Sequence, residues 1–101
     1  MEVISLTWRE MPKKNIDNSA KERLFGTISK LKGPNEVKQF LGDLLSSSEV
    51  KDLARRLLAA EYLFDGKTYE MVREDLGMGM ATINKVHFKT KGSKILYNLL
   101  T

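Results

Sequence analysis

The chain has 101 residues, of which 42% are hydrophobic and 30% charged, a composition typical of one folded domain and unlike that of a disordered protein. It has no cysteine and no apolar run near the ~20 residues of a membrane helix, which excludes disulfides, thiolate metal sites and membrane insertion. Because residues 1–7 also lack a secretory pattern, we expect a cytoplasmic protein. The net charge of +4 lies entirely after residue 76, since all 13 acidic residues and 13 of the 17 basic ones come earlier, and it suits either a polyanionic partner or a solvated tail.

The first 33 residues predict an arm followed by a helix. Residues 1–17 show no sustained period, and we expect an irregular N-terminal arm whose only large apolar side chain, Trp8, has no evident role. The domain is then expected to span residues 18–101. Leu24, Phe25, Ile28 and Leu31 recur at helical spacing, which predicts a first helix that ends near residue 33.

Two longer helices are expected next. Pro34 suits a first helical position and Glu36 the first turn of a second helix. This helix has a complete apolar stripe, expected to be core, at Val37, Phe40, Leu41, Leu44 and Leu45. Ser46 and Glu49 have the spacing of a capping box, which starts a third helix that runs to about residue 66. The apolar residues of this third helix cover more of its surface than one stripe, so we expect other helices to pack against it on two sides.

The last third of the chain predicts two short helices joined by a tight glycine turn, over residues 68–88. Thr68 can cap the first, which has Tyr69, Met71, Val72 and Leu76 facing inward, and Gly77 can end it. Gly79 is expected to allow the close turn. Residues 80–88 then form the second of the two short helices, with Met80, Ile83 and Val86 facing inward. Ser93 can cap a final helix with Ile95, Leu96, Leu99 and Leu100 on its apolar face. No segment alternates as a strand does, so the fold class is all-α.

This pair of helices is a helix-turn-helix pattern, and the second helix is long enough to enter a DNA major groove. Asn84 can pair with adenine, Lys85 can reach guanine or phosphate, and Ala81 or Thr82 can contact a thymine methyl. Lys89, Lys91 and Arg73 can contact phosphate. Groups at the start of the helix that begins at Thr68 can do the same. Thr68 caps that helix, and Tyr69 either contacts phosphate or packs in the core. An ordinary helical hairpin with a solvated face is the alternative, but the absence of acid on the second helix favours DNA.

Residues 46–86 resemble the Trp repressor superfamily, especially its YerC/YecD-like branch. The resemblance rests on residues 53–57 (LARRL), 63–69 (LFDGKTY) and above all 76–86 (LGMGMATINKV). It implies a six-helix domain in an intertwined homodimer, in which the helix-turn-helix of each subunit projects from a core that both subunits share. A two-fold protein of this kind would bind a palindromic DNA site.

The family's tryptophan site is only partly matched. The resemblance places a ligand site at Ser46, Arg56 and Lys85, with Arg56 matching an arginine of the third helix. Lys85 and Val86 stand where the family pattern has an arginine and a glycine, so one planar guanidinium is missing and a branched side chain is present. We therefore expect no tryptophan corepressor and no other cofactor, with any small effector unknown. Arg56 can instead pair with Asp52, one helical turn earlier.

Enzymatic and metal-binding functions are not indicated. His87 is the only histidine, so an imidazole cluster cannot form within one chain, and we expect a packed or phosphate-facing ring. No convergent acid pair and no activated nucleophile is evident. The sequence thus predicts a homodimeric, sequence-specific DNA-binding transcriptional regulator that acts as a repressor. The alternative is a helical protein–protein interaction module with the same fold, and RNA binding is less favoured because no aromatic stacking platform is visible.

Overall fold

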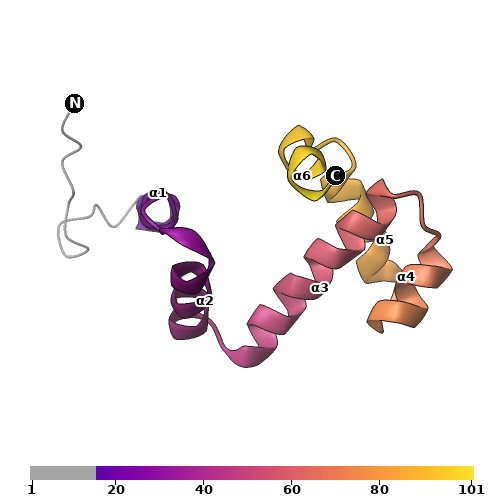
Figure 1. Cartoon of the computed structure of the whole chain (residues 1–101), viewed down its shortest axis with the longest axis horizontal. Helices are drawn as coiled ribbons and strands as arrows, with labels where there is room; N and C mark the ends of the chain where they lie inside the picture. Colours follow the sequence, from indigo (N-terminus) through magenta and orange to yellow (C-terminus); the bar gives the residue numbers. More distant parts are fainter. Residues whose placement is uncertain (1–15) are drawn as a thin grey trace. The chain divides into compact units, whose positions relative to one another are not determined.

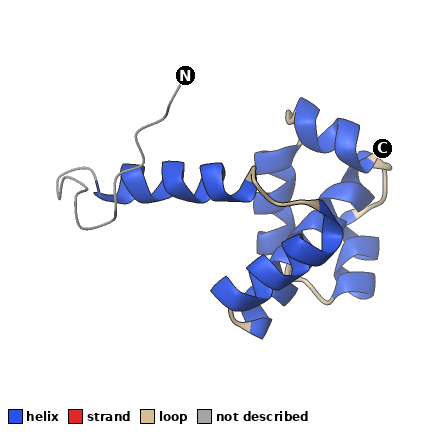
Figure 2. Ribbon diagram, turned by 60° about the vertical axis from the view of Figure 1, so that its left-hand side comes forward, coloured by secondary structure: helices blue, strands red, loops and turns tan. Residues whose placement is uncertain are grey.

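The computed structural model describes residues 16–101, and within that range it contains six helices and no strand (Figures 1 and 2). The helices are α1 (Ile16–Ile28), α2 (Gly33–Leu44), α3 (Ser47–Phe64), α4 (Tyr69–Leu76), α5 (Met80–Thr90) and α6 (Lys94–Leu100). The all-α prediction is confirmed. The described residues fall into two compact units, one up to Asp43 and the other from Leu44 to Thr101. No helix among residues 16–101 is both long and apolar enough to cross a membrane.

The first unit contains α1 and nearly all of α2. Helix α1 begins two residues before the predicted start, and the rest of the predicted arm, with Trp8, lies outside the described residues. It also ends five residues before Gly33, in a tight turn in which the Ser29 hydroxyl donates to the Gly26 carbonyl at 2.7 Å. Gly33 has a φ of +81°, which favours glycine. Glu36 then binds the start of α2, because its Oε1 accepts the backbone amide of Lys32 at 2.9 Å.

The apolar stripe of α2 is not a core within one chain, contrary to the prediction. Neither α1 nor α2 has a buried residue. Phe40 and Leu41 are half-buried, whereas Val37 and Leu44 remain 40% and 59% exposed. The helical period was predicted correctly, but no residue of α2 is buried.

Helix α3 starts where the sequence predicts and ends at Phe64, two residues before the expected end. Ser46 Oγ accepts the amide of Glu49 at 3.2 Å and Glu49 Oε1 accepts the amide of Ser46 at 2.9 Å, which completes a capping box. The backbone and hydroxyl hydrogen bonds from Ser46 lower the pKa of Glu49 below its ordinary value of 4.5. The helix ends at Phe64, and Gly66 follows with a φ of +80°.

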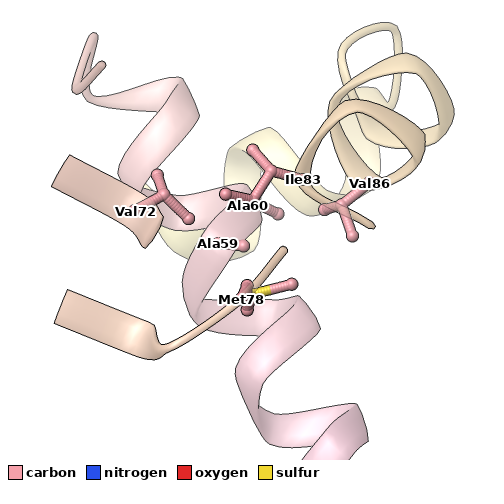
Figure 3. Packing of buried hydrophobic residues seen from close by; sticks show 6 residues of the cluster. All are labelled: Ala59, Ala60, Val72, Met78, Ile83 and Val86. Carbon is pink, nitrogen blue, oxygen red and sulfur yellow. The ribbon is translucent and has the colours of Figure 1, made fainter. Parts of the chain in front are cut away.

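The buried core of the second unit lies where α4 and α5 pack against α3 (Figure 3). Two alanines of α3 are fully covered, and their small side chains let the two short helices come close. Helices α4 and α5 also contact each other, and α6 contacts α3. The core consists of Ala59, Ala60, Val72, Met78, Ile83 and Val86. Outside it, the Tyr62 hydroxyl donates to Asp75 Oδ2 at 2.9 Å, a bond between α3 and α4 that raises the pKa of Tyr62.

Several residues predicted to face inward are exposed. Met71 and Met80 are 44% and 43% exposed, because Val72 and Ile83 occupy the centre of the contact with α3 and leave the methionines at its edges. On α6, Leu96 and Leu100 are half-buried, whereas Ile95 and Leu99 are exposed.

Candidate nucleic-acid interface

The turn between α4 and α5 positions the two helices of the predicted helix-turn-helix. Gly77 adopts a left-handed conformation (φ 64°, ψ 34°), and its amide donates to the Arg73 carbonyl at 2.9 Å. Met78 is 7% exposed, so its side chain anchors the turn in the core (Figure 3). Gly79 has a φ of −71°, which any residue adopts, and a Cβ there would meet no atom within 4 Å. The expected need for glycine is therefore confirmed at Gly77 and wrong at Gly79.

The start of α4 is formed as predicted. Thr68 is the N-cap, and its Oγ1 accepts the amide of Met71 at 3.2 Å. Arg73 lies one turn further on, where its Nη2 forms an exposed ion pair with Glu70 Oε2 at 3.0 Å. Because an exposed ion pair contributes little to stability, Arg73 can exchange Glu70 for another anion at small cost.

Helix α5 has a buried face and an acid-free exposed face. Ile83 is fully buried and Val86 is 7% exposed, which fixes the side that packs on α3. The polar and small residues predicted to contact bases are all exposed: Ala81, Thr82, Asn84 and Lys85. The helix has 11 residues, two more than predicted, and is thus about 16 Å long, compared with a major groove ~12 Å wide.

Three polar side chains form a hydrogen-bonded cluster across α4 and α5. The Tyr69 hydroxyl lies 2.7 Å from His87 Nδ1 and donates to Asn84 Oδ1 at 3.3 Å. The rings of Tyr69 and His87 also meet edge to face, with centroids 5.6 Å apart. Tyr69 and His87 are half-buried, whereas Asn84 is exposed. The structure favours packing over phosphate contact for Tyr69. The ring of His87 packs against Tyr69.

Sequence reasoning missed this cluster because it treated the three residues separately. Asn84 and His87 are three residues apart on a helix, so they share a face. That spacing, next to a tyrosine in the first turn of the preceding helix, was the available signal.

The end of α5 is basic and carries an exposed aromatic ring. Lys89 lies in its last turn and Lys91 directly follows it, both exposed. Phe88 is 76% exposed, and the Nζ of Lys91 lies 4.8 Å from the centre of its ring. These lysines belong to the acid-free stretch that carries the net charge.

The residues of the expected ligand site are not joined to one another. Ser46 Oγ is occupied by the cap of α3, and both Arg56 on α3 and Lys85 on α5 are exposed. No hydrogen bond or ion pair joins these three side chains, and the predicted pair of Arg56 with Asp52 is absent among the ion pairs of residues 16–101. The same range contains no cluster of three or more His, Asp or Glu residues suited to a metal ion.

Comparisons with known proteins identify the family of the chain. The family model described as "Trp repressor protein" matches residues 19–98, which include α4 and α5. The uncharacterized protein YerC of Bacillus subtilis is 37% identical over 65 residues, which cover 64% of this chain and 62% of that protein. The chain thus matches less than two thirds of this relative's length. No solved structure matches. Because the family model covers most of the chain, the protein belongs to the Trp repressor family.

Proposed function

We propose that the protein is a homodimeric, sequence-specific DNA-binding transcriptional regulator that acts as a repressor. The observation that carries the proposal is the acid-free exposed face of α5, directly opposite the buried Ile83 and Val86. A helix fixed by its apolar face on a small core presents its other face in a defined orientation, as groove reading requires. Membership of the Trp repressor family supports the same function.

The exposed face of α5 has side chains for base contacts. Asn84 can accept from and donate to an adenine edge, and Lys85 can donate to guanine or to phosphate. Ala81 and Thr82 are small enough to approach a thymine methyl. Met80, exposed at the start of the helix, adds a flexible apolar contact that the sequence prediction had assigned to the core.

Phosphate contacts are assigned to Lys89, Lys91 and Arg73, with Thr68 at the start of α4. Such contacts fix the orientation of the protein and make affinity depend on salt. If each subunit neutralises about four phosphates, log affinity should fall against log salt with a slope of about −7 for a dimer.

The dimer is proposed because apolar side chains remain uncovered in the single chain. They include Phe25 of α1 (57% exposed), Leu44 of α2 (59%), and Ile95 (73%) and Leu99 (75%) of α6. Large apolar side chains left in water on α1, α2 and α6 support the proposal that these helices contact another chain. A second copy would cover them and would place two α5 helices for a palindromic site.

No tryptophan corepressor is proposed. Val86 packs within the core, and Lys85 provides no planar guanidinium to stack on an indole. Arg56 is exposed and forms no hydrogen bond with Ser46 or Lys85.

The experiment that tests the function is selection of bound sequences from a random duplex library, with wild-type protein and with Lys85→Glu. We expect a palindromic sequence to be enriched by the wild type and not bound by the variant. Asn84→Ala should relax the preference at one base pair of each half-site, whereas Lys89→Ala should weaken all sequences alike. Lack of enrichment, with weak binding that Lys85→Glu leaves unchanged, would contradict the proposal and favour a protein–protein interaction module that uses the exposed apolar residues of α3 and α6.

A further inference from the structure

One hydrogen-bond direction satisfies both contacts in the cluster of Tyr69, His87 and Asn84. A tyrosine hydroxyl has one proton, so it can donate to only one of its two neighbours. The 3.3 Å bond uses that proton for Asn84 Oδ1. The 2.7 Å contact must then be donated by His87, from a protonated Nδ1 to the tyrosine oxygen. The consistent chain runs from His87 Nδ1–H to Tyr69 Oη–H to Asn84 Oδ1.

The opposite direction would turn the Asn84 amide around. If His87 Nδ1 were unprotonated, it would accept the tyrosine proton, and the tyrosine oxygen could only accept from Asn84 Nδ2. The two arrangements place opposite ends of the amide next to Tyr69. They therefore present the donor and the acceptor of the exposed amide in opposite orders.

We propose that Tyr69 and His87 are positioning residues that fix the order in which Asn84 presents its amide donor and acceptor to a base. This inference rests on the proposed function. Adenine offers an acceptor at N7 and a donor at N6 in a fixed order, so only one amide orientation makes both hydrogen bonds from a given helix position. The half-buried tyrosine and histidine specify the base without touching it.

The first test needs no DNA. Nitrogen-detected NMR of the free protein at about pH 8.5, where an ordinary imidazole is neutral, distinguishes the two histidine tautomers. We expect His87 to carry its proton on Nδ1. Tyr69→Phe keeps the edge-to-face ring contact but lacks the hydroxyl. In this variant, His87 should become a mixture of the Nδ1-protonated and Nε2-protonated tautomers. A proton on Nε2 in the wild type would overturn the inference.

The second test measures base preference at the base pair that responds to Asn84→Ala in the selected duplex. Loss of a fixed bidentate contact should reduce discrimination there by about 5- to 100-fold in Tyr69→Phe and leave the other positions unchanged. His87→Asn, whose amide nitrogen can replace the Nδ1 donor, should retain the preference that His87→Ala loses. Tyr97→Phe is the matched control, because Tyr97 is an exposed residue of α6 that packs its ring on Phe64.

The outcomes separate this inference from the function on which it rests. If wild-type protein selects a sequence and Tyr69→Phe keeps the full preference at the Asn84 position, the inference is wrong and the regulator stands. If the wild type selects no sequence, both are wrong. Thermal unfolding of each variant shows whether it is folded, and the His87→Asn and His87→Ala pair still decides the inference if Tyr69→Phe does not fold.

Discussion

Ile83 is the side chain on which the position of α5 most depends. It is fully buried among residues of α3 and α4, so its truncation removes apolar contacts and leaves a cavity. We expect Ile83→Ala to lower the free energy of unfolding by about 2–5 kcal/mol, measured by urea denaturation. The control is Met80→Ala, one turn earlier on the same helix and 43% exposed, which should change it by less than about 1 kcal/mol. Equal losses in the two variants would contradict the assignment of the core face.

Single residues show where sequence reasoning succeeds and where it stops. The spacing of Ile83 and Val86 identified the centre of the buried face of α5 correctly, because burial follows the helical period. It did not identify the edge of that face, so Met71 and Met80 were assigned inward. The bonds of Tyr69 to Asn84 and His87 depend on how two helices cross, and no local pattern contains that information.

At the scale of elements, the α4–α5 turn gives a matched pair of glycine substitutions. Gly77→Ala should destabilise the protein by about 1–2 kcal/mol, because an alanine in the left-handed conformation is strained. Gly79→Ser should stabilise it by a few tenths of a kcal/mol, because Gly79 is the N-cap of α5 and provides no side-chain cap. Thermal unfolding of both variants is the measurement. A greater loss at Gly79 than at Gly77 would show that the two glycines have the opposite roles.

The cap of α3 gives a pH prediction. Since the folded state lowers the pKa of Glu49, its charge contributes stability above the ordinary value of 4.5, and this contribution is lost as the pH falls through the lower folded value. Glu49→Gln keeps a hydrogen-bonding side chain but has no charge. The wild type should therefore be the more stable protein at pH 7, and the difference should narrow below about pH 4. A difference in unfolding midpoint that stays constant from pH 7 to pH 3 would contradict this account.

Element boundaries followed from the sequence where a cap or a left-handed glycine defines them. The start of α3 at Ser46 and the end of α4 at Gly77 were both predicted, because the residue types at these positions satisfy backbone groups directly. The end of α1 was not, because Ile28 is followed by a turn rather than by glycine. The end of α5 was placed two residues short, since Lys89 and Thr90 continue the helix without any apolar signal.

At the scale of the whole molecule, uncovered apolar surface makes the oligomeric state testable. We expect sedimentation equilibrium to give twice the 11.5 kDa mass of one chain. Leu99→Lys should shift the protein toward the monomer, because it places a charge on an apolar residue that is 75% exposed in one chain. Asn98→Lys, the same charge at the adjacent polar position, is the control. A monomeric wild type at micromolar concentration would contradict the proposed dimer.

The division into two units bears on which surface covers the apolar stripe of α2. Length and composition favour one domain, and the stripe of α2 has the pattern of a core. Periodicity shows that a face must be covered, but not whether the same chain or another copy covers it. The exposed face of α5 was predicted more completely, because Asn84 and Lys85 lie opposite a buried face contained within the second unit.

The most direct test of the central claim is a map of where α5 lies on DNA. Since the chain has no cysteine, Thr82→Cys provides one attachment point for a photo-cross-linker on the exposed face of α5, and Lys51→Cys provides a control on the exposed side of α3 in the same unit. On the selected duplex, we expect cross-links from position 82 to major-groove base edges in each half-site and few from position 51. Cross-links from position 51 that equal or exceed those from position 82 would show that another face binds the DNA.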